Sequence, residues 1–314
     1  MKTASLVSLA AIAAAALILS PAWAQDTRLI HIPSEDAPAY AEAEWNLPVP
    51  KADGPVYERT FIAEGDAAAT APDGAGHYVA KEYNFPMGAL RVLKWDSVPV
   101  IHQITFETQL YMLKGSATVG LAGETVTVNA GDAVFLPSGI LRNPDPEGET
   151  VILTYIVSNS AEAPKAKIVR GEGLNVMAIA QWMDGDDPTT ATDHDAILSA
   201  PDGAAKFTVK RYSGDGNSFR HAVLEAGGRT TPATNGRDIL IYVNKGRMKR
   251  TEDGVEYMIK AGDAIREENA KSGYWEILED SEFIATDMPF DPSQPRYNLQ
   301  RSPNAVAGAG YRQE

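Results

Sequence analysis

The sequence predicts an all-β chain in which one antiparallel barrel is built twice, and three observations support this fold class. From about Val56 onward, short runs rich in β-branched and aromatic residues alternate with Gly, Pro and Asp turn signals. An internal repeat returns at an offset of 131 residues, as from Gly131 to Gly262. With 314 residues and 44% hydrophobic content, the chain is long and apolar enough to fill one or two cores.

The repeat joins a strand, a tight turn and a second turn in each copy. Tyr111–Gly115 matches Tyr242–Gly246, and the segment Ala130–Ala133 matches Ala261–Ala264. Glycine at such positions suits turns that need a positive φ angle. Because the offset exceeds the roughly 20–50-residue period of solenoid repeats, the pattern indicates two copies of a whole domain.

The composition excludes several classes of function. The chain has no cysteine, so it has no disulfide, thiolate metal site, iron–sulfur cluster or cysteine nucleophile. Its 42 acidic residues outnumber its 28 basic residues, and the formal net charge is −14. This balance argues against a nucleic-acid partner, which would require a surplus of Lys and Arg.

Residues 1–24 have the pattern of a secretory signal peptide. Lys2 supplies the positive start, Leu6–Leu19 is an apolar run too short to span a membrane, and Ala22–Ala24 is a small-x-small cleavage pattern. Cleavage would leave Gln25 as the new N-terminus. We therefore expect a periplasmic or secreted protein with no membrane association after cleavage.

The remaining chain divides by composition. A short helix is predicted over Leu174–Met183, where the strand rhythm is interrupted. The expected organisation is an irregular N-terminal arm (25–54), a first barrel domain (55–160), a linker with the short helix (161–205), a second barrel domain (206–290) and a C-terminal tail (291–314).

The turn segments resemble those of the cupin superfamily, and the duplication resembles a bicupin. The family's second motif, G-x5-P-x-G, is matched by Gly131, Pro137 and Gly139, and Gly115 matches the glycine that ends the first motif. The resemblance implies a small antiparallel jelly-roll barrel in each copy, with a short helical or irregular connection between them. It also implies a small-molecule or metal site inside a barrel.

The metal-ligand positions implied by the family are mostly replaced. In the first copy they fall on His102, Ile104, Thr108 and Arg142. A divalent transition metal requires about three or four N or O donors, and Ile and Arg cannot supply them. We therefore expect no metal and no other cofactor. A one-residue register shift would offer His102, Glu107 and Gln109 as a fallback ligand set.

The second copy departs further from the family pattern. Its corresponding positions are Ala233, Asn235, Ile239 and Gly273. This barrel is expected to serve packing or dimerisation, and pairing of edge strands would allow a homodimer.

Strand alternation predicts which side chains line the first barrel. Its interior is expected to hold His102, Ile104, Thr108, Leu110, Met112 and Arg142. His102 and Arg142 are the catalytic candidates, since His102 could move a proton and Arg142 could clamp a carboxylate. Tyr111 alternates to the opposite face, and its recurrence at Tyr242 indicates a packing role.

Three functions stay open. The first is an exported bicupin that binds a small carboxylated or polyhydroxylated organic molecule in the first barrel. His102 would then support metal-independent isomerase, epimerase or lyase chemistry, which the residues favour over dioxygenase chemistry. The second is a metal-dependent oxygenase or lyase with an altered ligand set. The third is a non-catalytic binding or structural protein.

Overall fold

The computed structural model describes most of the chain beyond the predicted signal peptide. The described residues are 29–50, 56–85, 88–95, 101–104, 108–121, 124–136, 139–146, 149–157, 166–214, 218–234, 238–267, 272–288 and 310–311. Some strand residues are described by their backbone alone. Within these ranges, no helix is long and apolar enough to cross a membrane.

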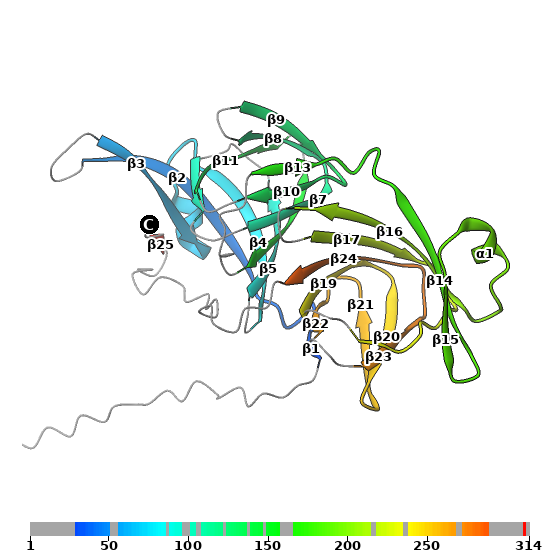
Figure 1. The fold of residues 1–314 in the computed structure, drawn as a ribbon. Helices are drawn as coiled ribbons and strands as arrows, with labels where there is room; N and C mark the ends of the chain where they lie inside the picture. The colour runs from blue at the N-terminus through cyan, green and yellow to red at the C-terminus, as the bar shows by residue number, and fades with distance from the viewer. Residues whose placement is uncertain are drawn as a thin grey trace, which may run out of the picture.

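The first barrel consists of a nine-stranded and a four-stranded antiparallel sheet (Figure 1). In spatial order, the larger sheet contains β13 (Lys167–Val169), β10 (Ala133–Leu136), β7 (Thr108–Lys114), β12 (Thr150–Val157), β5 (Gly88–Trp95), β4 (Gly76–Phe85), β2 (Ala39–Pro50), β3 (Val56–Glu64) and β25 (Gly310–Tyr311). The smaller sheet contains β6 (Ile101–Ile104), β11 (Gly139–Pro146), β8 (Ser116–Leu121) and β9 (Glu124–Asn129).

The second barrel repeats this plan with an eight-stranded and a four-stranded sheet. The larger sheet contains β1 (Ile30–Ile32), β22 (Ala264–Glu267), β19 (Asp238–Lys245), β24 (Ser281–Met288), β17 (Ser218–Leu224), β16 (Ala205–Ser213), β14 (Val176–Asp184) and β15 (Asp187–Ala191). The smaller sheet contains β18 (Ala233–Thr234), β23 (Ser272–Ile277), β20 (Arg247–Glu252) and β21 (Val255–Lys260). The predicted all-β fold class of two antiparallel barrels is therefore confirmed.

Two short helices complete the described elements. The 3-10 helix η1 covers Gly65–Thr70, and α1 covers His194–Leu198. The side chain of Asp193 caps α1 by accepting a hydrogen bond from the amide of Ala196 at 2.6 Å.

The prediction of a helix over Leu174–Met183 is wrong, because this segment forms β14. It pairs with β16 from Val176 to Gln181, and its outer end forms a hairpin with β15. Short apolar runs suit either a strand or a buried helix, and here cross-strand pairing decides the outcome. The predicted linker therefore contributes two strands to the larger sheet of the second barrel.

The predicted irregular arm also contains strands. β1 pairs with β22 in the second barrel, and β2 pairs with both β3 and β4 in the first. β13, which follows the first barrel in sequence, pairs with β10 at the corresponding edge of the first barrel. Each barrel thus receives an edge strand from the segment that precedes the other barrel in sequence.

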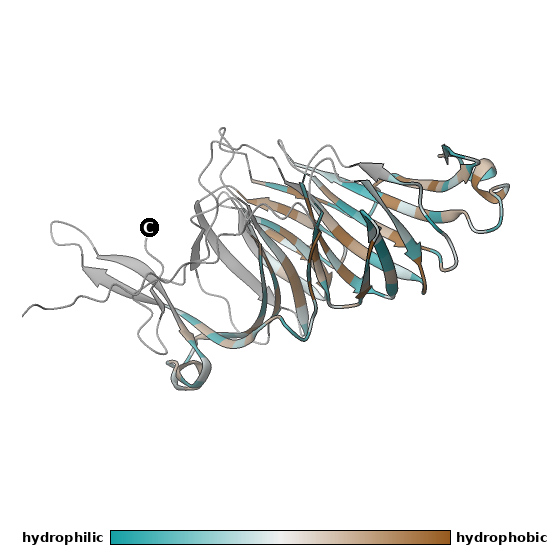
Figure 2. Cartoon of the chain, turned by 90° about the horizontal axis from the view of Figure 1, so that it is seen from below, coloured by the Kyte–Doolittle hydropathy of each residue, from teal (hydrophilic) through white to brown (hydrophobic). Residues whose placement is uncertain are grey.

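The described residues form three apolar clusters, and apolar and polar residues alternate along the strands (Figure 2). One cluster lies inside the first barrel and includes Met112 and Val134. A second lies inside the second barrel and includes Met248 and Ile265. The third lies between the two large sheets and is rich in tyrosine and phenylalanine. The two barrels therefore pack through the outer faces of their large sheets.

Tyrosines link the barrels at the repeated glycine turns. The hydroxyl of Tyr212 donates to the carbonyl of Gly131 at 2.8 Å, and the hydroxyl of Tyr83 donates to the carbonyl of Gly262. The ring of Tyr111 packs edge-on against Tyr212, with centroids 5.5 Å apart. Burial raises the pKa of Tyr111, so its phenol stays neutral at physiological pH. The packing role predicted for Tyr111 agrees with this arrangement.

The second turn is fastened to the N-terminal strand by Asp263. Its carboxylate accepts hydrogen bonds from the amides of Ser34 at 2.8 Å and Lys260 at 3.0 Å, and contacts His31 Nε2 at 2.9 Å. Burial alone would raise the pKa of Asp263, but the hydrogen bonds from His31, Lys260 and Ser34 outweigh it and hold that pKa below its usual value.

Replacement of Asp263 by Asn is expected to lower stability at neutral pH by about 1–3 kcal/mol and to flatten its decline in acid. Because the pKa of Asp263 is lower in the folded than in the unfolded state, its ionised carboxylate stabilises the fold at pH values above the unfolded pKa of about 3.9. This stabilisation is lost as the pH falls through the folded pKa. Urea unfolding from neutral pH to about pH 3 measures the effect. The exposed Asp202 provides the control through Asp202→Asn. Parallel pH curves for wild type and Asp263→Asn would contradict the expectation.

Candidate functional site

The two predicted catalytic residues lie on neighbouring strands of the small sheet of the first barrel. In the β6–β11 ladder, His102 pairs with Leu141, and Arg142 pairs with Ile101. His102 and Arg142 are therefore offset by one residue in this ladder, and in a regular pleat such an offset places two positions on opposite faces of the sheet, against the prediction that both face the interior. The pairing of β11 with β8 shifts register between Arg142 and Asp145. The side chains of His102, Ile104 and Arg142 lie outside the described part of the structure, so their meeting in one cavity stays a prediction.

The predicted ligand-binding residues on β7 lie on the interior face. Thr108 is buried and pairs with Leu136. Met112 and the partly buried Leu110 belong to the interior cluster of the first barrel. The wall opposite β6 and β11 is therefore apolar along β7, with one hydroxyl from Thr108.

Gln109 alternates away from this interior. Its side chain is buried between the large sheets, where its Oε1 accepts a hydrogen bond from Thr286 of the second barrel at 2.7 Å. Gln109 therefore does not fit its fallback role as a metal ligand in the first barrel. Glu107, also in that fallback set, lies outside the described residues. Within the described ranges, no three or more His, Cys, Asp or Glu side chains are grouped to hold a metal ion.

A buried charged group that the sequence did not indicate lies on the same interior face. On β5, Arg91 Nη2 is 2.6 Å from Glu42 Oε1, and Arg91 Nε is 3.4 Å from Glu82 Oε2. All three side chains are more than nine-tenths buried. Burial alone would lower the pKa of Arg91, but Glu42, Tyr78 and Glu82 raise it, so the guanidinium stays charged.

The interior polar group continues toward β2 and the end of β5. Tyr78 donates a 2.5 Å hydrogen bond to Glu44, and its ring lies 4.4 Å from that of Trp95 between centroids. Thr154 on β12 pairs directly with Arg91. The first barrel thus combines aromatic surface with carboxylate, guanidinium and hydroxyl groups on one wall.

Apart from Arg91 Nε, which keeps its 3.4 Å ion-pair contact with Glu82, three atoms of this wall make no hydrogen bond within the structure as described. They are Glu42 Oε2, Trp95 Nε1 and Thr154 Oγ1, and all three are shielded from solvent. Buried polar atoms in native proteins nearly always have a partner, so each unpaired one requires an explanation. A bound polar molecule inside the barrel would supply the missing partners.

The interior of the second barrel also holds a buried charged group. Arg250 lies 3.5 Å from Glu252 and 3.3 Å from Glu267, and its guanidinium lies 5.3 Å from the ring centroid of Trp275. A Cβ on Gly273 would lie only 2.6 Å from the Arg250 guanidinium carbon. Glycine at position 273, one of the positions where the resemblance implies a ligand, therefore leaves room for the Arg250 guanidinium.

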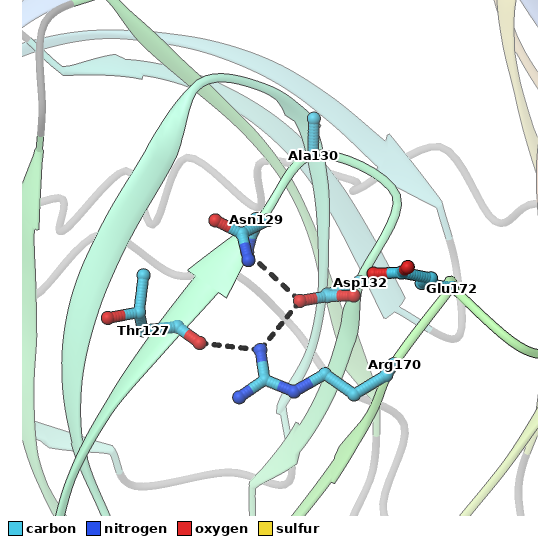
Figure 3. Close-up of a pocket in the computed structure, with 6 residues that line it drawn as sticks. All are labelled: Thr127, Asn129, Ala130, Asp132, Arg170 and Glu172. Atoms are coloured by element: carbon cyan, nitrogen blue, oxygen red, sulfur yellow. Dashed lines mark hydrogen bonds and ion pairs between the residues drawn. The ribbon is translucent and has the colours of Figure 1, made fainter.

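A separate surface pocket of ≈ 480 Å³ lies at the first Gly-Asp turn (Figure 3). Asp132 accepts hydrogen bonds from Arg170 at 2.7 Å, from the amide of Gly171 at 2.9 Å and from the amide of Asn129 at 3.0 Å. Asp132 and Arg170 satisfy one another, and the hydrogen bonds of Asp132 hold the segment after β13 against the turn. This turn corresponds to the Asp263 turn of the second barrel.

Comparison with known proteins gives matches in solved structures only. No family model matches the sequence, and no curated protein matches it. Protein Ylba from E. coli shares 14% identity, with a TM-score of 0.45 over 73% of this chain and 88% of that chain. A cupin 2 conserved barrel domain protein from Leptotrichia buccalis shares 12% identity, with a TM-score of 0.41 over 68% and 89%. A variant of Bacillus subtilis oxalate decarboxylase shares 16% identity, with a TM-score of 0.48 over 70% and 75%.

The described strands define an all-β protein of antiparallel barrels, in which each barrel pairs a large sheet with a four-stranded sheet. Its duplicated Gly-Asp turns and this topology agree with the cupin-type barrel fold that the sequence predicts. The likeness to solved structures concerns the fold, and it transfers no residue roles at these identities.

Proposed function

We propose that this protein is a bicupin whose first barrel binds a small polar organic molecule. The observation that carries the proposal is the set of three buried, unpartnered polar atoms of Glu42, Trp95 and Thr154 on one interior wall. Ligand sites in proteins combine apolar surface with a few placed polar groups, and the mixture of Met112 and Leu110 with these polar side chains has that character.

We further propose that His102 moves a proton on the bound molecule. An imidazole titrates near neutral pH and can act as general base and then as general acid, as isomerase, epimerase and lyase chemistry requires. His102 lies on β6, in the four-stranded sheet of the first barrel. The donors at the family's metal positions do not fit a metal ion, so no step is assigned to one.

Ligand-detected NMR on the purified mature protein tests the binding proposal, with pooled sugars, sugar acids and hydroxy acids as probes. We expect at least one pool to bind the wild type. Trp95→Phe removes an unpartnered indole N–H from the first barrel and should weaken that binding at least tenfold, by about 1.4 kcal/mol. The matched change in the second barrel, Trp275→Phe, should leave binding unchanged. No binding from any pool, or equal losses in both variants, would contradict the proposal.

We also propose that the chain is exported and cleaved after Ala24. The apolar run followed by a small-x-small site supports this proposal. Intact-mass measurement of the expressed full-length protein should give a product beginning at Gln25 in the periplasmic or secreted fraction. A product that retains residues 1–24 would overturn it.

A further inference from the structure

Among the described side chains, the charges facing the interior of the first barrel are mostly negative. Glu42, Glu44 and Glu82 supply three carboxylates, whereas Arg91 supplies one guanidinium. Counted as formal charges, these described side chains sum to −2. Electrostatic interactions are strong away from bulk water, so an excess of buried carboxylates disfavours a second anion beside them.

The unpartnered atoms also define which ligand groups would suit them. Glu42 Oε2 accepts hydrogen bonds, Trp95 Nε1 only donates, and Thr154 Oγ1 does both. A ligand hydroxyl both donates and accepts, so hydroxyl groups suit each of the three atoms. A ligand carboxylate cannot donate to Glu42, and a ligand ammonium cannot accept from Trp95.

The aromatic part of the wall fits the same class of molecule. The rings of Tyr78 and Trp95 are buried next to one another, tilted by 30°. Aromatic rings with a polar edge provide apolar contact together with hydrogen bonding. A saccharide or cyclic polyol presents C–H groups and hydroxyls together, and so matches both kinds of contact.

From these observations we infer that the first barrel selects a neutral, hydroxyl-rich molecule of the saccharide or polyol class over its carboxylated counterpart. The inference rests on the proposed function of the first barrel. It replaces the expectation that a carboxylate is as good a ligand as a set of hydroxyls. The recognising groups are Glu42, Trp95 and Thr154.

Thermal-shift titration of the mature protein with matched sugars tests the inference. The probes are glucose and galactose, their uronic acids and their 2-amino derivatives, at equal millimolar concentrations. We expect a neutral sugar to raise the melting temperature more than its uronic acid does. In Thr154→Val, affinity for that sugar should fall at least tenfold while the melting temperature of the free protein is kept, because the lost hydroxyl has no protein partner.

Thr286→Val is the matched control, because the Thr286 hydroxyl is bonded to Gln109 between the large sheets. This variant should melt at a lower temperature yet bind the sugar with unchanged affinity. A larger shift with a uronic acid, lost in Thr154→Val, would overturn the ligand class and leave the binding site standing. No shift with any probe would overturn the inference and count against the proposed function as well.

Discussion

Replacement of Arg91 by Met is expected to destabilise the protein by about 3–5 kcal/mol, the cost typical of leaving a buried charge unpaired. Glu42 and Glu82 would then face one another inside the first barrel without the guanidinium that separates them. Methionine keeps much of the side-chain length, so the loss reflects charge more than volume. Urea unfolding at neutral pH measures the difference through the midpoint and the slope.

Two further variants make the Arg91 result specific. Adding Glu42→Gln to Arg91→Met removes one of the stranded charges and should restore part of the stability. Lys114→Met removes an exposed ion pair with Glu149 and should leave stability nearly unchanged. An Arg91→Met protein as stable as wild type would show that this charged group does not stabilise the first barrel.

Replacement of Gly246 by Ala is expected to cost about 3 kcal/mol or more, well above the cost of the same change at Gly254. Both glycines have a positive φ, of 84° and 78°, so alanine is strained at either position by about 1–2 kcal/mol. At Gly246 a Cβ would also lie 2.4 Å from the carbonyl oxygen of Asp280 and 2.7 Å from Cα of Ser281. Overpacking against backbone adds further cost, because neither atom can rotate away.

Gly254 is a matched control, since a Cβ there would meet nothing within 4 Å. Comparison of the urea midpoints of Gly246→Ala and Gly254→Ala isolates the clash from the shared cost of the left-handed backbone. Equal losses in the two variants would mean that β24 moves aside freely. The fold predicts that it does not, because β24 is held between β17 and β19.

The sequence predicted those parts of the fold that depend on local pattern and on the repeat. The matched Gly-Asp turns indicated two similar barrels, and the structure places Gly131 and Gly262 in equivalent tyrosine-bonded turns. The alternation of Tyr111 away from the first-barrel interior was also visible in the sequence, because strand faces follow a two-residue period.

Long-range pairing decided the elements that the sequence could not predict. The local pattern predicts a helix in place of β14, because its partner β16 follows only after β15 and α1 in the chain. The sequence predicts an irregular arm in place of β1, because the ladder of β1 joins Ile30 to Arg266, far along the chain. Neither partner leaves a local signal, so tertiary pairing overrides propensity.

The sequence indicated only part of the candidate site, again because long-range strand pairing leaves no local signal. The motif positions pointed to the first barrel, and Thr108, Leu110 and Met112 lie on its interior wall. The charged group around Arg91 carries no motif, because Glu42 and Glu82 reach it only through the register of three strands. An alternating buried Glu or Arg in a β-rich run is the one sequence signal that could have revealed it.

A crystal structure of the mature protein soaked with the sugar that binds best tests the central claim most directly. We expect the sugar to lie inside the first barrel, with hydroxyl oxygens about 2.6–3.2 Å from Glu42 Oε2 and Thr154 Oγ1. A sugar bound outside that barrel would contradict it, as would a first-barrel interior in which those two atoms are paired with the protein's own side chains.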